Sequence, residues 1–210
     1  MLRLIGLVIL VGVAGLLVFV GLQSDSYRVE RSVMMTASPG QVYAQVYDLQ
    51  KWQAWSPWME LDPNSKVTFE GPTSGPGAIM RWAGNEKVGR GAMAITDARP
   101  DEAIKIRLDF VEPMEGTSDV RFAFEPEGQG TKVTWSLEGK QSFVERLICT
   151  IMGINVEQMV GSDYERGLAK LKSVAEAAPP AAAPTPEAPP APEVIPGPGA
   201  IPAPESTPPD

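Results

Sequence analysis

The stretch from Asn155 to Ala177, NVEQMVGSDYERGLAKLKSVAEA, has the residue spacing of an amphipathic helix. Its apolar residues recur at steps of three and four, which places them on one helical face. They are Val156, Val160, Tyr164, Leu168, Leu171 and Ala175. The charged residues between them are typical of the opposite, solvent-exposed face of the helix. Gly161, followed by a capping-box pattern at Ser162 and Glu165, leaves open whether the helix is continuous or restarts there.

From Tyr27 to Lys140, short segments alternate apolar and polar residues at period two, which is typical of strands with one buried face. Turns rich in glycine and proline separate these segments. The predicted strands are 27–37, 67–70, 78–83, 89–98, 104–110, 120–125 and 132–138. Clean alternation favours an antiparallel sheet with one wet face. Its apolar face must be buried, and the long C-terminal helix is the element available to cover it.

A helical insertion is predicted after the first strand. Ser38 has the side chain of a helix cap, and Pro39 suits the first helical position. A second short helical turn is expected over Lys51–Trp55. A small helical unit therefore separates the first predicted strand from the other strands of the sheet.

Leu4 to Leu22 is a run of 19 residues without charge or proline. As a helix it is about 28 Å long, close to the thickness of a bilayer core. Arg3 precedes it, so the positive-inside tendency places the N-terminus in the cytoplasm and the domain on the extracytoplasmic (periplasmic) side of the inner (cell) membrane. The alternative is a cleaved signal peptide, but its apolar core is usually shorter and no A-x-A-like site occurs over 21–26. We expect an uncleaved single-pass anchor over residues 1–25.

Residues 178–210 differ in composition from the rest of the chain. They hold 13 of the 21 prolines, mixed with alanine and glutamate. Such a segment cannot form a helix or bury a core, so a disordered Pro/Ala-rich tail is predicted. A polyproline-II ligand for a protein partner is the alternative. The folded domain then covers 26–177, which is enough for one core.

Composition excludes several function classes. The net charge is −8 and no basic patch occurs, which argues against nucleic acid. The chain has no histidine, which removes the commonest general base and the commonest metal ligand. The single cysteine, Cys149, excludes an intrachain disulfide and a cysteine-based zinc site. Its apolar neighbours in sequence predict a small buried hydrophobe. We expect no cofactor and no metal.

Several short motifs occur in a recognisable order over Tyr27–Glu176. They are Ser38-Pro39 with Val42 and Asp48, Trp52 to Pro57, Gly77 with Met80 and Trp82, Gly89-Arg90-Gly91 with Met93 and Ile95, Phe110 with Pro113, Gly130-Thr131 before Val133-Thr134-Trp135, and Gly167-Leu168 with Leu171-Lys172. With the order of elements, they resemble the helix-grip domain of the START-like, or SRPBCC, superfamily, especially its small bacterial polyketide cyclase/dehydrase-like proteins.

The resemblance implies an α+β helix-grip fold, in which a curved antiparallel sheet of six to seven strands wraps around the long C-terminal helix. It also implies a cavity between sheet and helix, open at one end, which relatives use for hydrophobic ligands such as lipids, quinones and polyketides. We expect a pocket of roughly 300–1,000 Å³, the usual size for a small-molecule site. The superfamily shares no catalytic motif, so the resemblance implies no catalytic residue.

Inward-facing apolar residues are the candidates for ligand binding. They are Trp52, Trp55, Met80, Trp82, Met93, Ile106, Leu108, Phe122, Phe124, Trp135 and Met159. A packed core requires the same residue types, so the sequence leaves a filled or a hollow interior open. For the tryptophan cluster, which also contains Trp58, the alternative is a plug at the end of the sheet. Charged residues near the predicted mouth are expected to form a solvated rim. These are Arg81, Glu112, Glu115 and Asp119.

Three function classes remain. The first is a membrane-anchored binder or carrier of an apolar small molecule. The second is an interaction module with a vestigial pocket, whose tail or sheet meets a protein partner. The third is a cyclase or dehydratase that uses a carboxylate or a tyrosine such as Tyr43 or Tyr47 as acid. The lack of histidine counts against the enzyme, and we favour the binder.

Overall fold

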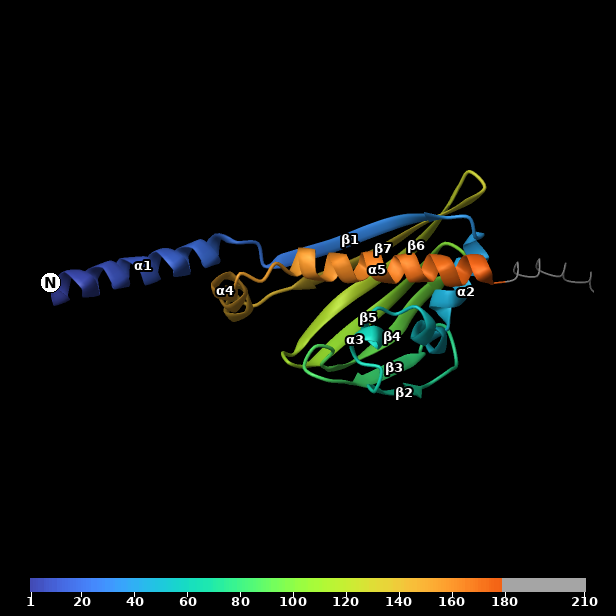
Figure 1. The fold of residues 1–210 in the computed structure, drawn as a ribbon, viewed down its shortest axis with the longest axis horizontal. Helices are drawn as coiled ribbons and strands as arrows, with labels where there is room; N and C mark the ends of the chain where they lie inside the picture. Colours follow the sequence, from blue (N-terminus) through green and yellow to red (C-terminus); the bar gives the residue numbers. More distant parts are fainter. Residues whose placement is uncertain (179–210) are drawn as a thin grey trace, which may run out of the picture.

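Seven antiparallel strands form one curved sheet in the computed structural model, which describes residues 1–178 (Figure 1). The strands are β1 (Ser26–Met35), β2 (Lys66–Glu70), β3 (Ile79–Ala83), β4 (Arg90–Arg99), β5 (Ala103–Glu112), β6 (Gly116–Glu127) and β7 (Gly130–Lys140). Their order in the sheet is β1-β7-β6-β5-β4-β3-β2. The predicted strand number and the antiparallel arrangement are confirmed.

One end of the sheet lies next to the N-terminal helix. There Ser26 of β1 pairs with Lys140 of β7. Further across the sheet, Phe110 of β5 pairs with Gly116 of β6 and with Gly91 of β4. The start of β1, the end of β5 and the start of β4 therefore lie at the same end, which we call the anchor-side end.

The long helix α5 (Val156–Ala177) crosses one face of the sheet (Figure 1). Its predicted inner face is confirmed, since Tyr164, Leu168, Leu171 and Ala175 are buried. The helix is continuous from its cap at Asn155, so it does not restart.

Two glycines, which have low helix propensity, lie within α5 at points where the helix comes close to the sheet. A Cβ at Gly161 would collide with the guanidinium of Arg31, and a Cβ at Gly167 would lie 2.8 Å from the ring of Trp135. Both glycines therefore mark close approaches to the sheet rather than a break in the helix. Ser162 does not act as a cap either, because its hydroxyl donates to the carbonyl of Met159, 2.9 Å away.

Three short helical segments follow β1: α2 (Pro39–Tyr47), the 3-10 helix η1 (Leu49–Ala54) and α3 (Trp58–Leu61). The first two were predicted from the sequence, and α3 was not. Ser38 caps α2 through a capping box, in which its backbone N–H donates to Gln41 Oε1 at 2.9 Å. α2 packs against α5, β5 and β6, at the end of the sheet opposite to the anchor side (Figure 1).

A further helix, α4 (Phe143–Met152), was not predicted from the sequence. A capping box between Ser142 and Glu145 begins it, and Gly153 ends it in the left-handed conformation. The expected burial of Cys149 is wrong: this residue lies on α4 and is only half-buried. α4 contacts α1 rather than the core of the sheet.

The N-terminal helix α1 (Leu2–Leu22) extends away from the domain (Figure 1). It is long and apolar enough to cross a membrane. Its last turns meet the domain at Val20, which is fully buried. The disordered tail was predicted over 178–210, and all of it after Ala178 lies outside the described part of the chain.

Candidate functional site

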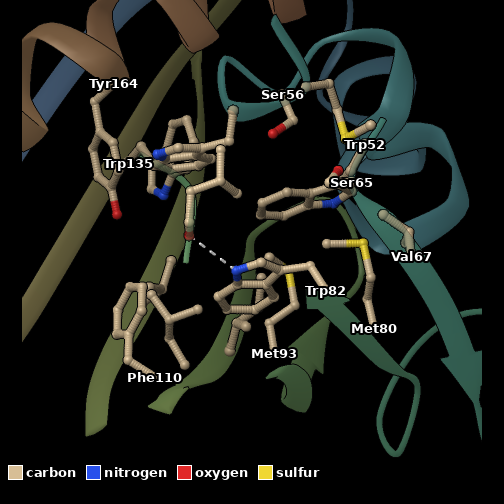
Figure 2. A pocket seen from close by; sticks show the side chains of 16 residues that line it. Trp52, Ser56, Ser65, Val67, Met80, Trp82, Met93, Phe110, Trp135 and Tyr164 are labelled. Atoms are coloured by element: carbon tan, nitrogen blue, oxygen red, sulfur yellow. Dashed lines mark hydrogen bonds between the residues drawn. The ribbon is translucent and has the colours of Figure 1, made fainter. Parts of the chain in front are cut away.

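A small apolar cavity lies between the sheet, the segments η1 and α3, and α5 (Figure 2). Its volume is about 80 Å³. The lining residues are Trp52, Ser56, Trp58, Met59, Ser65, Val67, Met80, Trp82, Val88, Met93, Ile106, Leu108, Phe110, Val120, Trp135 and Tyr164. The cavity is narrower than the pocket expected from the resemblance.

The cavity occupies the anchor-side half of the sheet. Met93 of β4 lies between Met80 of β3 and Leu108 of β5, and all three line the cavity. One step closer to the anchor-side end, the neighbours in the sheet are Trp82 and Phe110, which also line it. Trp82 and Phe110 are therefore the aromatic lining residues on the same side as α1.

Trp82 is held against the sheet by its neighbours. Its indole Nε1 donates to the carbonyl of Val88 at 3.3 Å, the interaction drawn in Figure 2. Phe110 meets its ring edge-on, with ring centroids 5.8 Å apart. A Cβ at Gly91 would come within 2.5 Å of the Trp82 ring, so only glycine leaves room for the indole at this position.

Trp135 and Tyr164 form the opposite wall (Figure 2). Their rings stack with centroids 3.8 Å apart and planes 15° apart, and Trp58 meets the Trp135 ring edge-on. Trp135 is 1% exposed, and its indole N–H makes no hydrogen bond of normal geometry among the described residues. Burial raises the pKa of the Tyr164 hydroxyl, which therefore stays protonated at neutral pH. This wall thus combines apolar area with a buried, unused donor.

With this geometry established, comparison with known proteins identifies the family. A family model described as "Polyketide cyclase / dehydrase and lipid transport" matches residues 26–176. The chain belongs to this family. The resemblance to the START-like, or SRPBCC, superfamily is confirmed by this match and by solved structures of the same fold. No curated protein matches the chain in sequence.

Solved structures share the family fold at low sequence identity. Protein CV1439 from Chromobacterium violaceum is 16% identical, with a TM-score of 0.51 over 72% of this chain and 97% of that one. The Aha1 dimer from Colwellia psychrerythraea is 14% identical, with a TM-score of 0.52 over 72% and 97%. The di-domain ARO/CYC protein BexL from the BE-7585A biosynthetic pathway is 18% identical, with a TM-score of 0.53 over 76% of this chain and 53% of its own. At these identities, the likeness concerns the fold alone.

Most of the candidate residues of this family member come together around the cavity. Seven of them line it: Trp52, Met80, Trp82, Met93, Ile106, Leu108 and Trp135. Three others, Trp55, Phe122 and Phe124, are buried in the core behind it and do not line it.

Met159 is misplaced by the sequence reading. Its side chain is 56% exposed on the first turns of α5, and it does not line the cavity. Val160 belongs to the apolar stripe of α5. Met159 precedes it by one position, so its side chain is about 100° away from the stripe around the helix.

Trp52 and Trp55 differ in role although they lie three residues apart. Both use their indole N–H groups within the helical insertion: Trp52 donates to the carbonyl of Val46 at 2.9 Å, and Trp55 to that of Gln45 at 3.2 Å. Trp55 is fully buried, whereas one side of Trp52 faces the cavity. The cluster is therefore partly a plug, as the alternative held, and partly a cavity wall.

Nine lining residues were not among the candidates: Ser56, Trp58, Met59, Ser65, Val67, Val88, Phe110, Val120 and Tyr164. The strand alternation could have found two of them, because Phe110 continues the phase of Leu108, and Val120 that of Phe122. Tyr164 is on the apolar stripe of α5. The residues in loops, such as Ser65 and Val88, carry no periodic signal.

The predicted rim residues lie outside the cavity lining. Arg81 Nε donates to Glu70 Oε1 at 2.8 Å, and Arg90 Nη2 to Glu112 Oε1 at 2.7 Å. The hydrogen bond from Arg81 lowers the pKa of Glu70. These exposed pairs contribute little stability each, and they place no carboxylate inside the cavity.

The tyrosines considered as acids also lie elsewhere. Tyr43 and Tyr47 stack with centroids 5.0 Å apart, and neither lines the cavity. Desolvation by burial, with charge repulsion from neighbouring groups, raises the pKa of Tyr43 to about 12. Among residues 1–178 no group of three or more acidic or cysteine side chains could hold a metal ion.

Proposed function

We propose that this family member is a membrane-anchored protein that binds or carries an apolar small molecule between its sheet and α5. Residues 1–25 are the anchor, and residues 26–177 are the binding domain. The observation that carries the proposal is the apolar cavity, whose walls are mainly tryptophan, methionine and aliphatic side chains. Such a lining, with few polar groups, is the usual make-up of a small-molecule site.

The ligand must open the cavity further. A volume of about 80 Å³ is smaller than the roughly 300–1,000 Å³ of drug-sized sites. Met59, Met80 and Met93 line the cavity, and their unbranched side chains adapt to a guest more easily than branched ones. Movement of these methionines is the route by which the cavity accepts a ligand.

The ligand carries a hydrogen-bond acceptor. The indole N–H of Trp135 is buried near the Tyr164 hydroxyl and makes no hydrogen bond of normal geometry within residues 1–178. A buried donor that lacks a good partner is unfavourable by about 1–3 kcal/mol. A carbonyl oxygen on the ligand would relieve this penalty. Quinones and polyketide-like molecules combine such an oxygen with apolar area, so they are the favoured ligand class.

The narrow volume supports a second candidate, an interaction module whose pocket is vestigial. In that case the cavity stays closed and no apolar molecule is retained. Catalysis is not part of the proposal, since the polar groups that line the cavity are serine and tyrosine hydroxyls and indole N–H groups, with no carboxylate among them.

Ligand binding is tested with the full-length protein in detergent. Its cavity tryptophans should be quenched saturably by decylubiquinone, a quinone with an apolar tail. Met93→Trp should abolish the saturable quenching, because the added ring occupies the cavity. Met34→Trp is the matched control, since Met34 is exposed on β1.

Native mass spectrometry with solvent extraction should find a co-purified apolar molecule. If the protein shows no saturable quenching and no apolar molecule is extracted from it, the assignment moves to the interaction module.

A further inference from the structure

Exposed apolar side chains gather around α4. Beyond residue 22, the described part of the chain has eleven large apolar residues that are exposed. Seven of them fall within 143–159: Phe143, Val144, Ile148, Ile151, Met152, Ile154 and Met159. Ile151 and Met152 are 65% and 68% exposed. Such a concentration of exposed large apolar residues in one segment indicates a binding face.

The amphipathicity of α4 is inverted relative to a helix on a soluble domain. Phe143, Val144, Ile148, Ile151 and Met152 share one half of the helix and are exposed. The other half holds the polar residues and faces the protein, whereas a helix on a soluble domain turns its apolar stripe inward. The outward face of α4 therefore requires an apolar partner.

The polar half of α4 is tied to the protein by hydrogen bonds. Gln23 Nε2 donates to Thr150 Oγ1 at 3.5 Å, and Arg146 Nη1 donates to the carbonyl of Gln141 at 3.3 Å. Gln141 Nε2 also donates to Cys149 Sγ at 3.6 Å. These contacts hold the helix in the orientation that turns its apolar half outward.

The position of α4 indicates what the partner is. α4 packs against the last turns of α1, where Val20 is buried. In Figure 1, α1 lies in the plane of the view and α4 is seen nearly end-on beside its end, so the two helices cross steeply. If α1 spans a bilayer, α4 lies along the bilayer surface at the depth where α1 leaves it. The exposed apolar half of α4 then meets the same bilayer that α1 crosses.

We propose that α4 is an interfacial helix, which inserts its apolar half into the lipid surface beside α1. The inference rests on the proposed role of α1 as an anchor. Interfacial helices of this type bury their apolar face about 5–10 Å into the boundary of headgroups and acyl chains. Because the cavity occupies the anchor-side half of the sheet, this second membrane contact also holds the cavity toward the lipid from which an apolar ligand would come.

The test uses the full-length chain in phosphatidylcholine/phosphatidylglycerol vesicles. Cys149→Ser removes the single cysteine, and Ile151→Cys then carries an NBD fluorophore. The matched control is Ser173→Cys in the same background, since Ser173 is exposed on α5, far along the helix from α4. Lipids with a nitroxide near the headgroup report contact with the membrane surface. The label at residue 151 should show blue-shifted emission that these lipids quench, and the label at residue 173 should show neither effect.

Three other results would overturn the inference, and they separate it from the anchor. Unquenched NBD at residue 151 in a chain that resists alkaline carbonate extraction would remove the α4 contact and leave the anchor intact. Extraction of the chain by carbonate would remove the anchor and the interfacial helix together. Efficient disulfide formation between unlabelled Ile151→Cys chains, together with no quenching of the NBD-labelled chains, would assign the face to a second copy. The ligand-binding assay reads the cavity independently of all three.

Discussion

Gly167 of α5 lies directly against the indole of Trp135: a Cβ on this glycine would be 2.8 Å from a ring carbon. The close approach lets Tyr164, one helical turn earlier, stack on the same indole. The helix and the cavity wall are therefore positioned by one small residue. This relationship has a measurable consequence for stability.

Gly167→Ala should destabilise the domain, by about 1–3 kcal/mol, because the added methyl group meets the Trp135 ring and Pro57. An alanine would otherwise favour a helix by about 1 kcal/mol over glycine. Gly161→Ala is the control, since its methyl group meets only the end of the flexible Arg31 side chain. Urea unfolding of both variants measures the difference. Equal effects would show that α5 does not approach the sheet as closely as described.

Leu171→Ala should lower the free energy of unfolding by about 2–5 kcal/mol, because Leu171 is fully buried between α5 and the sheet. Lys172→Ala, at the next position, should stay within about 0.5 kcal/mol. Lys170 forms an exposed ion pair with Glu60, so Lys170→Ala should also have a small effect. Chemical denaturation reports all three. A large loss from a lysine variant would contradict the helix phase.

Alkaline pH should destabilise the folded state. An unfolded tyrosine loses its proton near pH 10, whereas burial keeps Tyr43 protonated to about pH 12, its pKa in the folded protein. Between these values the unfolded state binds fewer protons, so stability is lost as pH rises from about 10 to 12. Tyr164, whose pKa is also raised by burial, adds to the loss.

Thermal unfolding between pH 8 and 11.5 measures this dependence. Tyr43→Phe should flatten the slope above pH 10, because the substituted side chain has no proton to lose. A slope that is unchanged in Tyr43→Phe would show that other groups cause the alkaline loss.

The anchor and its orientation are tested by a reporter that is active only outside the cytoplasm. Fused after Glu176 in the full chain, it should be active, because Arg3 before α1 favours a cytoplasmic N-terminus. The same fusion should run at the mass of an uncleaved chain. Activity of a cytoplasmic reporter at this position would reverse the orientation, and loss of about 2–3 kDa would indicate a cleaved signal peptide.

The sequence by itself determined the order of elements and the burial of the main faces. Period-two alternation places Ile106 and Leu108 on the inner face, and steps of three and four place Leu168 and Leu171 on the inner side of α5. These patterns are readable because each element repeats its backbone geometry, so a side chain's direction follows from its position in the repeat.

Only the tertiary structure decided how the buried space is divided. Trp52 faces the cavity and Trp55 packs behind it, although both are buried aromatic residues in the same short segment. The cavity volume likewise depends on how side chains from six strands, β2 to β7, meet those from η1, α3 and α5. No local pattern encodes such distances between segments that are remote in sequence.

The direction of α4 was also decided only by the tertiary structure. Its sequence contains a clean apolar half, and periodicity alone would turn that half toward a core. The contacts of its other half, such as Thr150 with Gln23, turn Ile151 outward instead. An amphipathic pattern specifies which residues share a face, but the surroundings of the helix decide whether that face meets protein or an external apolar phase.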